Sequence, residues 1–195
     1  MSGAKAVRKY TVVEAVAHGT CPICTMLRHR QTQLVEETGI PSAKHLCNQH
    51  AWALARAGPG LVAADLLLQS LRTRRTEGTK AARMPCDLCE RLMREESDKL
   101  KELARKMETT AFLEWMRLHG TLCLHHATRI AGELSPEGRK MIAELLSRTW
   151  EGLERDLADY AQHAGRGEHA GGGVLGRAAE FLVCQRGIPG EETQC

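Results

Sequence analysis

Cysteine and histidine recur in this sequence in a pattern that occurs twice. Each copy opens with a CxxC pair, in "CPICTMLRHR" and in "CDLCERLMRE", and each is followed by a CxxH pair, in "LCNQHA" and in "LCLHHA". The first copy supplies Cys21, Cys24, Cys47 and His50. The second copy supplies Cys86, Cys89, Cys123 and His126. Structural zinc prefers thiolate sulfur and imidazole nitrogen as ligands. The pattern therefore predicts two zinc ions, each bound by three cysteines and one histidine.

These pairs are expected at the first turns of helices. Pro22 has no backbone N–H to donate and suits a first helical turn, which places Cys24 there. Unpaired N–H groups and the positive end of the helix dipole lower thiolate pKa values. Helix starts that converge on an ion would therefore stabilise its ligands. The spacing leaves open whether a CxxC pair shares its ion with the CxxH pair of its own copy or of the other.

The same residues have other possible uses. Six cysteines could be buried apolar side chains, but their recurrence at matched spacing argues against this. A thioredoxin-like redox role for "CPIC" needs a βαβ pattern, which the sequence does not show. An iron–sulfur cluster is the alternative cofactor to zinc. A catalytic zinc ion is disfavoured because four protein ligands leave no position for water.

Two adjacent histidines compete for the last ligand position of the second copy. Aligning "LCNQHA" with "LCLHHA" places His126 opposite His50, and the CxxH spacing agrees. We therefore expect His126 to be the ligand, with His125 at the surface or next to the ligand set.

Helices are expected to position these residues, because aromatic residues are scarce and leucine, alanine and methionine supply most of the apolar mass. The predicted fold class is all-α, a helical bundle built from the two repeats. In the first repeat, helical spacing runs from Ile23 to a stop at 38–41, then from about 47 to 57, and then from about 61 to 75. The broad leucine face of the third segment predicts a well-buried helix.

The second repeat predicts a long helix with Leu88, Leu92, Leu100, Leu103 and Met107 on one face, and the helical signal continues to Gly120. It has 33 residues between Cys89 and Cys123, against 22 between Cys24 and Cys47. Eleven extra residues make about three helical turns, which could lengthen a helical arm without rotating the ligands, unless the helix breaks near Thr109 and Thr110. A further helix is expected from Cys123 to about Leu134.

The C-terminal part begins with an N-cap at Ser135 and Pro136 at the first helical position. The long amphipathic helix that they start carries one apolar stripe: Ile142, Leu145, Leu146, Trp150, Leu153, Leu157 and Tyr160. We expect a single helical domain over 1–163, with repeat one at about 10–75, repeat two at about 80–134 and the long helix at 135–163. Residues 164–195 are expected to be a flexible Gly-rich linker and a short segment, "RAAEFLVCQRG", that could form a helix docked on the body.

Charge and hydropathy limit the classes of partner. The formal charge is +3, and two sites of three thiolates and one divalent ion would lower it to about +1. This gives little support for nucleic acid, and the densest basic stretch is better explained as a solvated helix end: Arg72, Arg74, Arg75, Lys80 and Arg83. No run approaches the roughly 20 apolar residues of a membrane span. We expect a cytoplasmic protein, where clustered cysteines hold metal more often than they form disulfides.

The remaining candidates have no ligand spacing. Trp52, Trp115 and Trp150 are expected to anchor the core. Six histidines are expected at the surface: His18, His29, His45, His119, His163 and His169. Cys184 is expected to be a small buried residue and Cys195 a free terminal thiol.

The two CxxC and CxxH elements, the helix ending in "DLADYA" and the closing "RAAEFLVCQRGIPG" resemble a family of bacterial proteins classed as a domain of unknown function. The resemblance covers about residues 10–190, although Cys184 stands where the family pattern has glycine. It implies an all-helical cytoplasmic protein with two metal-binding repeats, and it brings no reaction. The expected function is a non-enzymatic binding or adaptor module with an unknown protein partner. The alternatives are an iron–sulfur or thiol-based redox sensor and a nucleic-acid-binding regulator.

Overall fold

The computed structural model describes residues 20–36, 44–57, 60–78, 84–166 and 173–183. Over these residues the chain forms helices and no strand, which confirms the predicted all-α class. The first repeat contains α2 (Pro22–Glu36), α3 (Asn48–Ala57) and α4 (Gly60–Glu77). The second contains α5 (Asp87–Met107), α6 (Thr110–His119) and α7 (Leu124–Ala131). They are followed by α8 (Pro136–Gly165) and α9 (Gly173–Val183).

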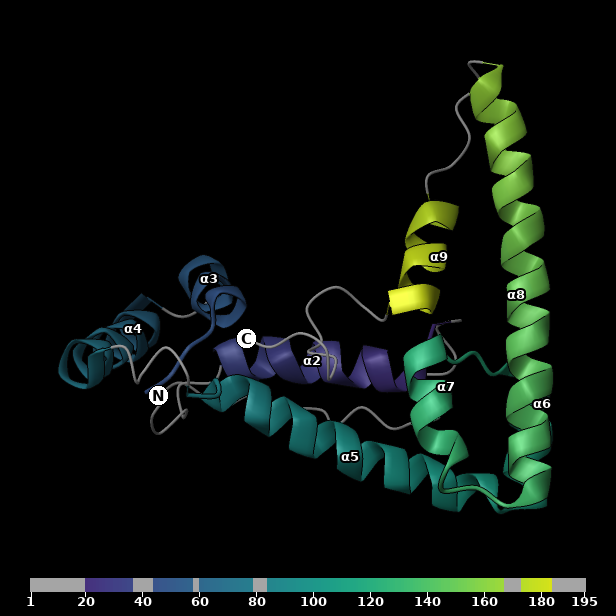
Figure 1. Cartoon of the computed structure of the whole chain (residues 1–195), viewed down its shortest axis with the longest axis horizontal. Coiled ribbons are helices and arrows are strands. Elements are labelled where there is room, and N and C mark those ends of the chain that lie inside the picture. Colours follow the sequence, from purple (N-terminus) through teal and green to yellow (C-terminus); the bar gives the residue numbers. More distant parts are fainter. Residues whose placement is uncertain (1–19, 37–43, 58–59, 79–83, 167–172, 184–195) are drawn as a thin grey trace, which may run out of the picture.

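The centre of the fold is the pair formed by α2 and α5, which lie side by side (Figure 1). The apolar stripe predicted for α5 is buried, and Leu88, Leu103 and Met107 are fully enclosed. Helices α3 and α4 lie at one end of the pair, whereas α7, α8 and α9 lie at the other (Figure 1). Most of the buried side chains belong to one hydrophobic core that the two repeats share.

The predicted long arm of the second repeat is broken into two helices. Helix α5 ends at Met107, and Thr109 has an extended backbone (φ −97°, ψ 128°) before α6 starts. The eleven extra residues therefore do not extend one straight helix, and the break falls at Thr109 and Thr110, where the sequence left it open. The second break follows α6, where the Gly120 N–H donates to Met116 O at 2.8 Å. A Cβ at Gly120 would lie 2.5 Å from that oxygen, so this close approach requires glycine.

The start of α8 confirms the predicted cap. The Ser135 hydroxyl accepts a hydrogen bond from the Gly138 N–H at 3.2 Å, and Pro136 is the first helical residue. The far end of α8 extends away from the other helices, and α9 packs back against α7 and α8 (Figure 1). Helix α8 continues to Gly165 and α9 begins at Gly173, so both helices include residues that the sequence assigned to the Gly-rich linker. Cys184 and Cys195 lie outside the described residues.

Two tryptophans predicted to anchor the core are exposed instead. Trp52 is 58% exposed and lies under the Arg56 guanidinium, 5.6 Å from the ring centroid. Trp150 is 44% exposed and makes an edge contact with Phe181 of α9. Trp115 is half-buried against the core. The core is filled by leucine, isoleucine and methionine, which pack between closely spaced helices without a polar N–H to satisfy.

Helix α4 is also less buried than predicted. Only Ala63, Leu66 and Ser70 are buried, whereas Leu61 is 85% exposed and Leu71 is 66% exposed. The helix packs against α3 at the outer edge of the molecule, so its neighbours cover one side of its apolar surface (Figure 1). None of the helices in the described part of the chain is long and apolar enough to cross a membrane.

Candidate metal sites

The predicted metal ligands gather into two groups that each combine both repeats. Cluster 1 consists of Cys21, Cys24, Cys123 and His126. Cluster 2 consists of Cys47, His50, Cys86 and Cys89. Within each cluster the sulfur and nitrogen atoms all lie within 4.8 Å of one another. The CxxC pair of one repeat thus meets the CxxH pair of the other, and the grouping by repeat that the sequence order suggests is not formed.

The direction of the two central helices explains this crossing. Helices α2 and α5 pack antiparallel, so the start of each lies at the end of the other (Figure 1). The chain that leaves α2 continues to α3, which carries its CxxH pair to the start of α5. Likewise, the chain that leaves α5 continues through α6 to α7 at the start of α2. His126 contacts Glu96 of α5, which lies ten residues after Cys86, so about 15 Å of this helix at 1.5 Å per residue keeps the CxxC and CxxH pairs of the second repeat apart.

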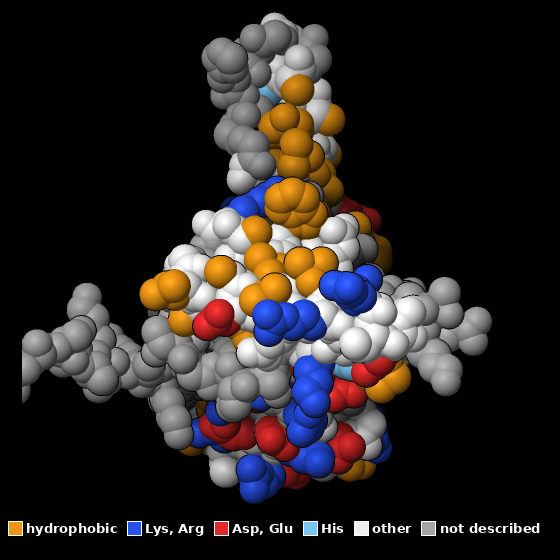
Figure 2. Space-filling view, turned by 90° about the vertical axis from the view of Figure 1, so that its left-hand side faces the viewer, with side chains coloured by type: hydrophobic (Ala, Val, Ile, Leu, Met, Phe, Trp, Pro, Cys, Tyr) orange, Lys and Arg blue, Asp and Glu red, His pale blue; other side chains and the backbone are white. Residues whose placement is uncertain are grey.

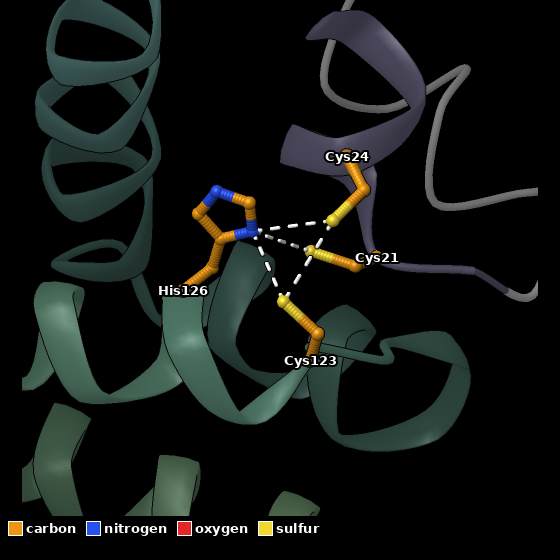
Figure 3. A group of neighbouring side chains, drawn as sticks. All are labelled: Cys21, Cys24, Cys123 and His126. Carbon is orange, nitrogen blue, oxygen red and sulfur yellow. Dashed lines mark hydrogen bonds between the residues drawn. The ribbon is translucent and has the colours of Figure 1, made fainter. Parts of the chain in front are cut away.

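Cluster 1 is arranged around the Nδ1 atom of His126 (Figure 3). This nitrogen lies 3.1 Å from the Cys123 sulfur, 3.3 Å from that of Cys24 and 3.4 Å from that of Cys21. The sulfurs of Cys24 and Cys123 are 3.7 Å apart. His126 is fully buried, and its ring points at the three thiols, as the alignment of the repeats predicted.

Cluster 2 repeats this arrangement around His50. Its Nδ1 atom lies 3.3 Å from the Cys47 sulfur and 3.4 Å from the sulfurs of both Cys86 and Cys89. The sulfurs of Cys47 and Cys89 are 3.8 Å apart. Two reciprocal hydrogen bonds hold the chain before α3 to the start of α5, since Asp87 N donates to His45 O and His45 N donates to the Asp87 carboxylate, both at 3.0 Å.

The spacing of these atoms fits one tetrahedral ion in each cluster. Zinc binds sulfur at about 2.3 Å and nitrogen at about 2.0 to 2.1 Å. At a tetrahedral angle these bonds separate two sulfurs by about 3.8 Å, and a sulfur and a nitrogen by about 3.6 Å. The distances of 3.7 and 3.8 Å between sulfurs agree with this, and those between sulfur and nitrogen, at 3.1 to 3.4 Å, are about 0.2 to 0.5 Å shorter. The two buried Cys and His clusters are therefore compatible with metal binding.

All four ligand pairs lie at helix starts, as predicted. Cys86 and Cys123 are the N-cap residues of α5 and α7. The carbonyl of Cys21 accepts from Thr25 N, and the carbonyl of Cys47 accepts from Ala51 N, which closes the first turns of α2 and α3. The positive ends of four helices thus converge in pairs on the two clusters, where they favour thiolate ligands.

The acid–base properties of the clusters follow from their contacts. The hydrogen bond with the Cys89 side chain, together with the bond to His50, lowers the pKa of Cys86 to about 3, although burial raises it. Burial lowers the pKa of His126, but hydrogen bonds with Cys123, Cys21 and Glu96 raise it to about 12. Thiolates stabilise the imidazolium proton at this position, and a divalent ion bound there would take its place.

Glu96 contacts cluster 1 and was not among the site residues predicted from the sequence. It is 2% exposed on α5, and its Oε1 atom lies 2.9 Å from His126 Nε2, 3.3 Å from His125 Nε2 and 2.6 Å from an Arg129 nitrogen. Burial raises the pKa of Glu96, but the hydrogen bonds and charges of His126 and Arg129 outweigh it and hold this pKa below its usual value. The carboxylate thus fixes the ring of His126 with Nδ1 toward the sulfurs.

Cluster 2 has no equivalent of this carboxylate among the described residues. His50 Nε2 is buried and has no hydrogen-bond partner there. His45, which was expected at the surface, lies close by in sequence with only 13% of its side chain exposed, because the contacts with Asp87 hold it against the fold. Its Nε2 atom is 3.8 Å from a Glu77 oxygen. The two clusters therefore have the same ligands but different surroundings.

A cavity of about 350 Å³ borders cluster 1, between the start of α7 and helices α8 and α9. The three cysteines of cluster 1 form part of its wall. Two arginines in this wall are already engaged, because Arg177 pairs with Asp156 at 2.6 Å and Arg148 donates to the Gly120 carbonyl at 3.4 Å. Both arginines therefore have partners within the protein.

Comparison of the chain with protein-family models, with curated proteins and with solved structures gives no match. The geometry of the two clusters is therefore the basis for assigning a function.

Proposed function

We propose that the protein binds one zinc ion in each cluster and that the two ions fasten its repeats into a non-enzymatic binding or adaptor module. The observation that carries this proposal is the crossed ligand set, in which each cluster takes two ligands from each repeat. An ion in either cluster would hold the start of α2 or α5 to a helix of the other repeat. Metal binding would then be part of the folding of the chain.

The choice of a single zinc ion is supported by the distances. The four ligand atoms of each cluster lie within 4.8 Å of one another, as in a site for one ion. An iron–sulfur cluster distributes its protein ligands over two or four iron atoms and needs space between them for the inorganic sulfur. Four protein ligands also leave no coordination position for a substrate or a reactive water, which supports a structural role.

The energy available from such sites is large for a chain of this size. Structural zinc contributes about 10 to 16 kcal/mol in small zinc-binding peptides, against a total folding stability of about 5 to 15 kcal/mol for a typical domain. We therefore expect the metal-free protein to lose the packing of α3 and α7 against the central helix pair.

Elemental analysis of protein purified anaerobically under reducing conditions tests this proposal. We expect two zinc ions per chain and a loss of helical circular dichroism when a strong chelator removes them. Cys184→Ser, which changes a cysteine that belongs to neither a CxxC nor a CxxH pair, is the control and should retain both ions. Fewer than one zinc per chain would contradict the proposal, and iron with a brown colour would establish the iron–sulfur alternative instead.

The adaptor role is supported by the exposed apolar side chains of α4. The basic residues Arg72 and Arg75 are exposed on the same helix. Binding of nucleic acid is therefore tested as the alternative to the adaptor role. Salt-sensitive binding that Arg72→Ala and Arg75→Ala weaken would support a regulator of nucleic acid, whereas no binding at low salt would dismiss it. Membership of the bacterial family and a cytoplasmic location remain part of the proposal.

A further inference from the structure

Helix α4 carries a second apolar face that no other described element covers. Its buried side, formed by Ala63, Leu66 and Ser70, packs toward α3. The opposite side presents Leu61, Ala64, Leu68, Leu71 and Arg75 to solvent. Leu61 is 85% exposed, Leu71 66% and Leu68 42%. Figure 2 views the molecule from the end at which α3 and α4 lie, and hydrophobic side chains gather across the middle of this face with lysine and arginine beside them.

The spacing of this face is that of a helix-pairing seam. Its members follow one another at intervals of three, four, three and four residues, which is the a and d pattern of a coiled coil. We call these five residues the α4 seam. It spans 15 residues, or about 21 Å, which is two heptads. A surface of this shape fits another α-helix.

Charges beside the α4 seam indicate which helix. Asp65 and Arg72 are seven residues apart, so they lie on the same flank of the seam, and both are exposed. Neither forms an ion pair within the described residues. If a second α4 helix lies antiparallel with Leu68 at the two-fold axis, Asp65 of each copy faces Arg72 of the other. The same arrangement places Leu61 near the aliphatic part of Arg75.

We propose that the chain forms a two-fold symmetric dimer through antiparallel packing of the α4 seam. The seam complements itself in this direction, with two Asp65 and Arg72 pairs that flank the leucines. A parallel pair would bring Arg75 against Arg75 at the centre of the seam, where like charges repel. The interface is short, so the expected affinity is that of a weak dimer in the micromolar range. The proposal is independent of which metal the clusters bind.

Sedimentation of the full-length metal-loaded protein over a range of concentrations tests the dimer. The wild type should pass from monomer to dimer as its concentration rises. Leu68→Glu should abolish the dimer, because it places two carboxylates at the symmetry axis. Asp65→Arg and Arg72→Asp should each weaken it roughly tenfold or more, because each change replaces both attractive pairs by repulsive ones.

A mixture of the two charge variants gives the sharpest outcome. Asp65→Arg and Arg72→Asp each repel themselves, but a heterodimer of the two restores an opposite charge at both contacts. Mixing them should therefore recover an affinity close to that of the wild type. Loss of folding cannot produce this recovery. Asp98→Arg, a charge reversal at an exposed position of α5, is the matched control and should dimerise as the wild type does.

A wild-type protein that stays monomeric at all concentrations would overturn the proposal, whether another part of the chain or a different protein covers the α4 seam. A dimer that Leu68→Glu leaves intact would also overturn it. So would two charge variants that fail to associate when mixed.

Discussion

Replacing Glu96 by glutamine should loosen cluster 1 without altering any of its four ligands. The carboxylate is buried and accepts hydrogen bonds from His126, His125 and Arg129. Glutamine has the same shape and can still accept from His126 Nε2, but it lacks the negative charge. It therefore orients the ring less firmly and makes the imidazole a weaker ligand.

The expected loss is 10- to 100-fold in the zinc affinity of cluster 1, which is the usual effect of removing a partner that orients a ligand histidine. This corresponds to about 1.4 to 2.8 kcal/mol. Arg129 contributes little to the loss, because 28% of its side chain is exposed and water can solvate it once the carboxylate is gone. The effect should therefore appear in metal binding at cluster 1 and leave cluster 2 unchanged.

Competition with a chromogenic zinc chelator measures this effect. The wild type should release its two ions in two phases, with cluster 2 first, because His50 Nε2 has no carboxylate partner among the described residues. In Glu96→Gln, cluster 1 should release its zinc ion at a chelator concentration closer to the one that removes the ion of cluster 2.

Glu95→Gln is the matched control for this experiment. Glu95 is the neighbouring residue on α5, and its carboxylate accepts from Arg30 Nε at 2.8 Å, away from both clusters. This variant should release zinc as the wild type does. If Glu96→Gln shows the same two phases as Glu95→Gln, Glu96 does not tune cluster 1 and the reasoning from its contacts is wrong.

The crossed ligand sets and the helix ends can be tested in the same way. The double variant Cys21→Ser/Cys123→Ser should keep one zinc ion, because both changes fall in cluster 1. Cys21→Ser/Cys47→Ser should keep none, because it changes one ligand in each cluster. Equal zinc contents of the two variants would contradict the crossed ligand sets. Gly120→Ala should lower the melting temperature by several degrees, at a cost of about 1 to 3 kcal/mol, because its Cβ would lie 2.5 Å from Met116 O. Gly152→Ala is its counterpart in open space and should raise the melting temperature slightly, and a reversed order of the two variants would refute the steric argument. Ser135→Ala should cost about 1 kcal/mol in thermal melts through loss of the bond to Gly138 N, and an unchanged melt would show that this cap does not stabilise α8.

The identity of the eight clustered residues was predictable because it depends on local chemistry. A CxxC pair and a CxxH pair each need only one helical turn to place their ligands, so their spacing is visible in the chain. Which pairs meet is a different kind of property. It depends on the antiparallel packing of α2 and α5 and on their lengths, and no residue within the four pairs encodes that direction.

The sequence contains an indirect indication of the buried Glu96. The apolar stripe of α5 runs through Leu88, Leu92, Leu100 and Leu103, and the eight-residue step between Leu92 and Leu100 passes over a buried position that Glu96 fills. A buried glutamate needs a partner of opposite charge or a set of donors, so such an interruption indicates a polar contact. The sequence alone does not say that the contact is the histidine of a cluster.

The burial of α4 could not be predicted from its pattern, because periodicity shows which side chains share a face and says nothing of how much neighbouring surface covers them. Leu61 and Leu66 are equally apolar, but Leu66 is 2% exposed and Leu61 is 85% exposed. The same holds for Trp52 and Trp150, whose helices lie at the outside of the fold. Exposed apolar residues that were expected in a core therefore indicate where a partner could bind.

Because each cluster joins the two repeats at a different end of the central helix pair, release of one ion should have a different effect on the fold from release of the other. Cluster 2 joins α3 to the start of α5, and α4 packs on α3, so release of its ion would free the α3 and α4 pair that carries the proposed dimer seam. Cluster 1 would still join the start of α2 to α7 at the other end of the central pair. Since Glu96 supports His126 and no described carboxylate supports His50, cluster 2 is the one expected to open first. A chain with this asymmetry would lose its dimerising helix pair before it loses its core, so partial chelation should yield monomers that retain one zinc ion and most of their helical structure.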